Sequence, residues 1–84
     1  MGTSRRIRPA RLAEKLRDIR LILNLNTEEM VRALNCPSVP LHRATITQYE
    51  KDRREPPLIV LLRYARLVGI SVDILIDDEE ELQK

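Results

Sequence analysis

The side chains that could do chemistry in this chain are mostly the guanidinium and ammonium groups of 15 arginines and lysines. Net charge is segregated along the sequence, at +5 over residues 1–20, −1 over 21–39, +3 over 40–66 and −5 over 73–84. Two basic blocks and one acidic segment create a polar field that suits a polyanionic partner on the basic side. The alternative is an ordinary solvated surface that ends in a frayed acidic tail.

Residue types used for catalysis and metal binding are scarce. Cys36 and His42 are the single cysteine and histidine, so the sequence offers no internal disulfide and no zinc-ligand spacing. Gly2 and Gly69 form no phosphate-binding loop, and no Ser/His/Asp grouping is visible. We therefore expect no enzyme, metal or cofactor. Cys36 is expected to be a small buried residue and His42 a turn or cap residue, with a phosphate contact as the alternative for His42.

The length of 84 residues suits one small domain, and the 43% of hydrophobic residues suffices for one core. No apolar run reaches the roughly 18 residues of a membrane span. No basic region followed by an apolar stretch and a cleavage site marks a secretory signal. We expect a small soluble domain inside the cell.

Apolar periodicity predicts an all-α fold of five short helices. In the first, Leu12, Leu16, Ile19 and Leu23 recur at i, i+4, i+7 and i+11, on one helix face. No alternating pattern typical of a strand is present. The predicted helices span about residues 9–23, 27–34, 40–51 and 57–68, and a last one begins at 72. The core stripe expected for the fourth consists of Leu58, Leu61, Leu62, Ala65 and Val68.

Local signals mark several helix ends. Asn26 with Glu29 three residues later has the pattern of a capping box. Gly69 stands where a helix C-terminus favours positive φ, and Ser71 is placed to cap the last helix. Two prolines interrupt the connector over residues 37–42, which either forms a loop or adds a turn to the start of the third helix.

Four segments, in order, resemble the Cro/phage-repressor helix-turn-helix family, also called the xenobiotic-response-element family. They are Leu-Asn-Thr-Glu-Glu-Met at 25–30, Arg-Ala-Thr-Ile-Thr-Gln-Tyr-Glu at 43–50, Arg-Glu-Pro at 54–56, and the segment 61–75 with its Leu-Leu, Ala65 and Gly69-Ile-Ser. The resemblance covers about residues 10–76. It implies a five-helix lambda-repressor-like bundle that contains a helix-turn-helix.

The chain departs from the family pattern at three places. The turn between the second and third helices is lengthened by residues 37–41, Thr27 replaces a frequent Gln, and Asp52 replaces a frequent Gly. The expected organisation is a flexible basic arm over 1–8, the helix-turn-helix domain over 9–76 and an acidic tail over 77–84.

In this family the third helix lies in the major groove of double-stranded DNA. Arg43 could read guanine, or contact a phosphate instead, and Gln48 could read adenine. Ile46 and Tyr49 are expected to point inward. The residues expected to contact bases are Arg43, Ala44, Thr47 and Gln48.

Contacts to the DNA backbone are expected at the start of the second helix and around the end of the third. The basic arm either enters a minor groove or only raises the local attraction for DNA. The residues expected to contact the DNA backbone are Asn26, Thr27, Thr45, Lys51, Arg53 and Arg54, and those of the arm are Arg5, Arg6 and Arg8.

The fourth and fifth helices carry more apolar residues than one core-facing stripe requires. We expect Ile59, Val60, Leu67 and Ile74 to form a homodimer interface, unless they only fill the core. The resulting hypothesis is a dimeric, sequence-specific transcriptional regulator, a repressor rather than an activator, in the cytoplasm on the nucleoid. The alternative is a protein-interaction or antitoxin-like module that uses this apolar surface.

Overall fold

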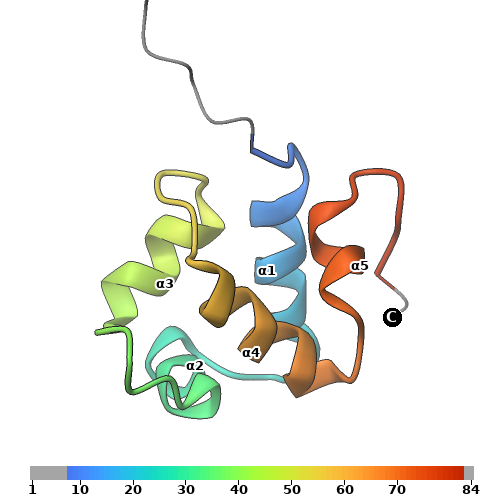
Figure 1. Cartoon of the computed structure of the whole chain (residues 1–84). Coiled ribbons are helices and arrows are strands. Elements are labelled where there is room, and N and C mark those ends of the chain that lie inside the picture. The colour runs from blue at the N-terminus through green and yellow to red at the C-terminus, as the bar shows by residue number, and fades with distance from the viewer. Residues whose placement is uncertain (1–7, 83–84) are drawn as a thin grey trace, which may run out of the picture.

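The computed structural model describes residues 8–82, which form five α-helices and no β-strand within that range (Figure 1). The helices are α1 (Leu12–Ile22), α2 (Thr27–Leu34), α3 (Arg43–Glu50), α4 (Leu58–Val68) and α5 (Val72–Ile76). The predicted all-α class and the order of the five helices are confirmed. Helix α1 begins later than predicted, because Pro9 and the two residues after it form a turn whose Pro9 carbonyl accepts from the Leu12 amide at 3.5 Å.

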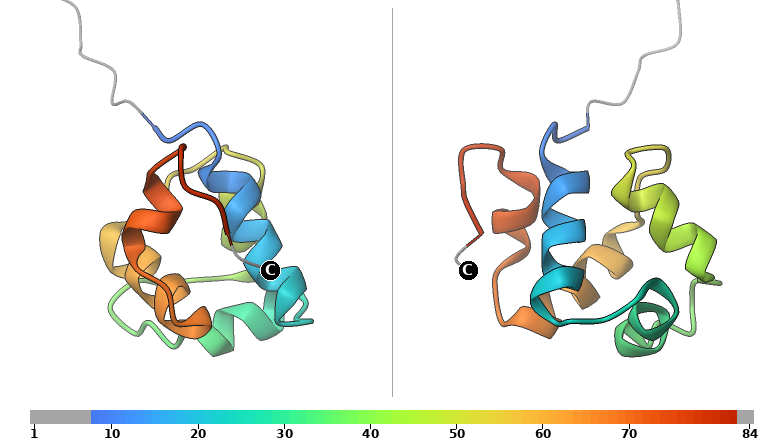
Figure 2. Two further views of the ribbon diagram at one scale, coloured as in Figure 1. Left: turned by 90° about the vertical axis from the view of Figure 1, so that its right-hand side faces the viewer. Right: turned by 180° about the vertical axis from the view of Figure 1, so that it is seen from behind.

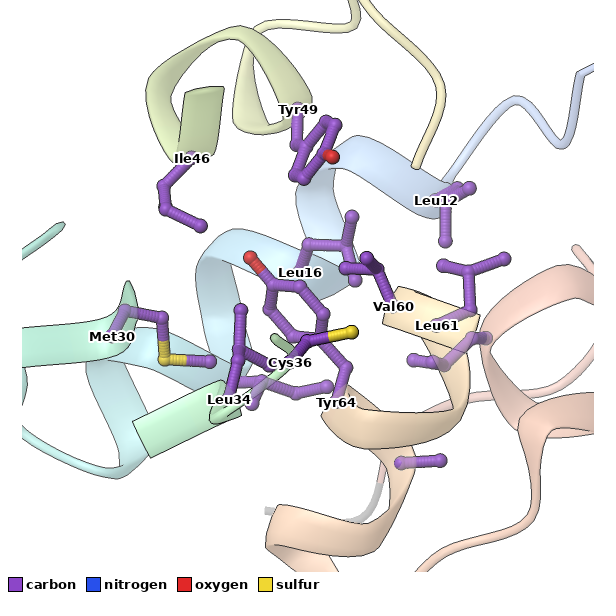
Figure 3. Close-up of a cluster of buried hydrophobic side chains, with 13 residues drawn as sticks. Leu12, Leu16, Met30, Leu34, Cys36, Ile46, Tyr49, Val60, Leu61 and Tyr64 are labelled. Carbon is purple, nitrogen blue, oxygen red and sulfur yellow. The ribbon is translucent and has the colours of Figure 1, made fainter. Parts of the chain in front are cut away.

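One core joins all five helices. Leu16, Ile46, Tyr64 and Leu75, from four different helices, are fully buried. In Figure 3 the ring of Tyr64 reaches from α4 into the middle of the cluster. Helices α1 and α4 lie between α3 on one side of the molecule and α5 on the other, as Figures 1 and 2 show from opposite directions. This arrangement leaves the outer face of α3 open to solvent.

Helix α2 begins and ends where the sequence predicts. The Asn26 side chain accepts a hydrogen bond from the Glu29 amide at 2.8 Å, and the Glu29 carboxylate accepts from the Asn26 amide at 2.9 Å. This capping box satisfies two amides at the helix start. Asn35 ends the helix with a φ of 45°, a left-handed conformation that Asn tolerates better than most residues.

The connector after α2 is a loop and not an extension of α3. Helix α3 begins at Arg43, and His42 before it is extended, with φ −127° and ψ 164°. Cys36 is buried in the core, as expected, while Val39 and Leu41 pack against the core's edge. These apolar contacts fix the loop, so the lengthened turn adds surface between α2 and α3 without moving α3 off the core.

Helix α4 buries Leu61 and Ala65 as predicted, but the rest of its buried stripe differs from the predicted one. Val60 and Tyr64 are fully buried, whereas Leu58 is 71% exposed. The segment has apolar residues on every side, so periodicity alone did not fix its rotation. The rotation observed places the large ring of Tyr64 in the core and leaves Leu58 outside.

The acidic segment after α5 is folded against α1. Asp78 accepts hydrogen bonds from the amides of Ala10 and Arg11 at 2.8 and 3.0 Å. Glu81 lies 3.3 Å from the Arg11 guanidinium. The left view of Figure 2 shows the chain running back along α1 after α5. Through residue 82, this acidic segment is therefore part of the fold, and it lies on the side of the molecule away from α3.

Lys15 lies within the apolar face of α1 and is almost fully buried, at 1% exposure, although its side chain carries a charge. Its ammonium group donates to the carbonyls of Ile74 and Asp77 at 2.7 and 2.8 Å. The last carbonyls of a helix lack partners within the helix, and a cation satisfies them well. Lys15 thus fastens the end of α5 to α1.

Candidate nucleic-acid interface

Helix α3 has one buried and one exposed face. Ile46 and Tyr49 are 0% and 2% exposed, which confirms that they point inward. Burial raises the pKa of the Tyr49 phenol above its usual value. The opposite face is polar, with Arg43, Ala44 and Gln48 exposed.

Two threonines of α3 are committed to local hydrogen bonds. The Thr47 hydroxyl donates to the Arg43 carbonyl at 3.2 Å, and Thr47 is half-buried. Thr45 is 7% exposed, and its hydroxyl accepts from the His42 amide at 3.2 Å. Thr45 was predicted to contact the DNA backbone, and in the structure its hydroxyl caps the start of α3 from the buried side.

A partly buried ion pair holds the far end of α3. The Arg20 guanidinium donates two hydrogen bonds to the Glu50 carboxylate, at 2.7 and 2.9 Å, and a third to the Leu25 carbonyl at 3.0 Å. The hydrogen bond with Glu50 raises the pKa of Arg20 above its usual value. This bidentate pair ties α3 to the end of α1 and to the residue just before α2's cap.

Basic side chains continue beyond the end of α3. Lys51, Arg53 and Arg54 are all exposed. Asp52 among them adopts a left-handed φ of 57°, and its carbonyl and carboxylate accept from the Arg8 guanidinium at 3.1 and 3.3 Å. The last residue of the predicted arm therefore lies beside the end of α3.

The remaining predicted backbone contacts and arm residues differ in their surroundings. Asn26 is exposed but uses its side-chain oxygen in the capping box, and Thr27 is half-buried. Arg5 and Arg6 lie outside the described residues.

The predicted dimer surface is corrected at one position and extended at two. Val60 is fully buried in the core, so it is not available to a partner. Ile59 is 38% exposed, and Leu67 and Ile74 are half-buried. The structure adds exposed Leu58 and Ile76, which sequence reasoning placed in the core stripe or left unassigned.

Residues 8–82 contain no group of three or more His, Cys, Asp or Glu side chains that could hold a metal ion. In the same range, every helix is too short or too polar to span a bilayer.

Comparison with known proteins is consistent with this geometry. A family model described as Helix-turn-helix matches residues 16–75, which takes in most of α1, all of α2, α3 and α4, and most of α5. No curated protein matches the chain.

Proposed function

The chain belongs to the helix-turn-helix family of the Cro/phage-repressor type, whose members are DNA-binding transcription regulators. From this premise we propose that the chain binds specific duplex sequences as a dimer, with α3 in the major groove. We propose further that it represses transcription by occupying those sequences. The exposed polar face of α3 is the observation that carries this proposal. It places a guanidinium, Arg43, and a carboxamide, Gln48, on the surface of a helix whose other face is buried.

Arg43 and Gln48 have the chemistry for reading bases. A guanidinium binds guanine O6 and N7 with two hydrogen bonds, and a carboxamide binds adenine N6 and N7. Each such pair contributes about 1–3 kcal/mol of discrimination against the wrong base. The methyl side chain of Ala44 is exposed, and we assign it an apolar contact with a thymine methyl group.

Phosphate contacts then fix the orientation of α3 in the groove. We assign this role to Lys51, Arg53 and Arg54, which follow α3 and are exposed. Arg8 lies beside the same end of α3, and we assign it to the same stretch of the DNA backbone. Asn26 and Thr27 are proposed to meet the backbone at the start of α2.

A two-fold dimer would present two copies of α3 to half-sites one turn, about 34–36 Å, apart. The exposed apolar residues support a partner surface on α4 and α5. Exposed apolar side chains such as those of Ile59 and Leu58 would be removed from water between two copies. Ile59, Leu67 and Ile74 remain its proposed members, and Leu58 and Ile76 join them.

The salt dependence of duplex binding tests the proposal. We expect the logarithm of the association constant to fall linearly with the logarithm of salt concentration, with a slope of about −0.9 for each neutralised phosphate. Arg53→Ala should make that slope shallower by the amount of about one phosphate contact, roughly 0.9, and should leave the base preference unchanged. If the protein is not retained by duplex DNA at low salt, the proposal fails, and an interaction module on the same fold becomes the better account.

A further inference from the structure

A hollow of about 330 Å³ lies between α2 and the start of α3. The hollow is close to the proposed base-reading residues, yet Arg43 is the one lining residue to which the proposed function gives a DNA-binding role. The residues that line it are Glu28, Val31, Arg32, Leu41, His42 and Arg43.

The charged side chains around this hollow are mostly basic. Arg32 and Arg43 each carry a positive charge, and both are exposed. Glu28 is the single acid among the lining residues, and its carboxylate lies 3.7 Å from the Arg32 guanidinium. The turn supplies no charged side chain over residues 36–41. The lining thus carries a net charge of +1 when His42 is neutral and +2 when it is protonated.

His42 is held in place by its backbone, and it lies at the surface. Its amide donates to the buried Thr45 hydroxyl at 3.2 Å, which fixes the residue at the start of α3. The residue is exposed, and it lines the hollow next to Arg43. A duplex strand that meets Arg43 therefore passes within reach of the imidazole.

We propose that His42 is a further DNA-contacting residue, which together with Arg32 binds a phosphate of the duplex backbone at this hollow, beside the base-reading Arg43, and does so more strongly when the imidazole is protonated. This inference rests on the proposed function. A consequence is that the affinity of the protein for DNA rises as pH falls. Histidine changes its charge between about pH 5 and pH 8, where DNA phosphates stay ionised.

The composition of the chain makes the inference easy to isolate. His42 is its only histidine. All other titratable groups are retained when His42 alone is replaced. Two variants separate the contributions: His42→Gln keeps a polar side chain without the charge, and His42→Lys carries a charge at every pH tested.

The test measures binding of a mixed-sequence duplex by the full chain and both variants, across a series of salt concentrations, at about pH 5.5 and pH 7.5. The wild-type chain should bind about threefold more tightly or better at the lower pH, with a salt slope steeper by about 0.9. His42→Gln should lose this difference between the two pH values. His42→Lys should bind at the higher pH as tightly as the wild type does at the lower one.

The outcomes separate this inference from the proposed function. If wild type and His42→Gln respond identically to pH while still binding duplex, the inference is overturned and the proposed function stands. If no protein binds duplex at either pH, the proposed function fails and the inference with it. As a control, circular dichroism of each variant at both pH values should give the same helical content as the wild type.

Discussion

At the scale of single residues, the core contains one polar atom that packing does not satisfy. The Tyr64 hydroxyl is buried and has no hydrogen-bond partner among the described residues. Burial raises the pKa of this phenol well above its usual range, with the nearby Glu50 carboxylate as a second cause. A buried hydroxyl without a partner costs free energy that the ring's apolar contacts must offset.

Removing that hydroxyl should therefore stabilise the protein. We expect Tyr64→Phe to raise the free energy of unfolding by about 1 kcal/mol, measured by urea denaturation at neutral pH. The matched variant Tyr49→Phe changes a second core tyrosine, which is not among the unpartnered groups. A loss of stability in Tyr64→Phe would show that its hydroxyl has a partner.

The ionisation of Asp78 links the stability of the fold to acid pH. Hydrogen bonds from the amides of Arg11 and Ala10 lower its pKa in the folded protein. A carboxyl whose pKa is lower in the folded than in the unfolded state stabilises the fold above its unfolded pKa, and this contribution is lost as pH falls through the folded value.

We therefore expect Asp78→Asn to be less stable than wild type at neutral pH and to lose less stability on acidification. Thermal melts between neutral pH and about pH 3, below the ordinary aspartate pKa near 3.9, measure both effects. Glu79→Gln, an exposed neighbour in the same acidic segment, serves as the control. Parallel acid profiles for wild type and Asp78→Asn would contradict this role.

At the scale of elements, the position of α3 depends on one ion pair from α1. The Glu50 and Arg20 side chains are 6% and 16% exposed, so breaking their pair leaves a charge that water only partly solvates. Removing one partner of a buried pair is strongly destabilising, because the remaining charge is left uncompensated.

Glu50→Ala should lower the free energy of unfolding by about 3 kcal/mol. The exposed pair between Glu28 and Arg32 offers a matched control, since surface pairs contribute little. Glu28→Ala should change stability by less than about 0.5 kcal/mol. Equal losses in the two variants, measured by chemical denaturation, would mean that the pair between Arg20 and Glu50 has no special role in holding α3.

The elements also show where sequence reasoning succeeds and where it stops. The bounds of α2 were predicted correctly because Asn26, Glu29 and Asn35 interact with their own helix ends. The burial of Lys15 and the pair between Arg20 and Glu50 could not be predicted, since their partners lie 59, 62 and 30 residues away. The buried stripe of α4 was predicted only in part, because its many apolar residues fit more than one stripe.

For the candidate interface, the sequence predicted which side chains are exposed better than it predicted their hydrogen bonds. Arg43, Ala44 and Gln48 are exposed as expected, since Ile46 and Tyr49 left only one rotation for α3. The buried cap that Thr45 forms was not predicted, because a threonine serves equally well as a surface residue and as a buried cap. Only coordinates separate those two roles.

At the scale of the whole molecule, charge and apolar surface are distributed over different sides. Helix α3 and the basic residues after it lie on the side opposite α5 and the acidic segment, which keeps negative charge away from the proposed DNA surface (Figure 1). Such a distribution favours one orientation of approach to a polyanion. Leu58, Ile59 and Ile76 are exposed, and the proposed dimer would cover them.

The dimer proposal predicts a concentration-dependent association. Ile59→Glu should shift the sedimentation equilibrium toward monomer and weaken binding to a duplex with two half-sites, with the helical content unchanged. Leu21→Glu places the same charge at another exposed apolar position, on α1, and should behave as wild type. A wild-type protein that stays monomeric at every concentration would contradict this part of the proposal.

The central claim is that the exposed face of α3 reads base sequence. Selection of bound duplexes from a random pool tests it most directly, with the wild type compared with Arg43→Ala and Gln48→Ala. The wild type should enrich one sequence with two half-sites about one helical turn apart, and each variant should relax the preference at particular positions within each half-site. A pool without enrichment, or an unchanged consensus in both variants, would contradict the account.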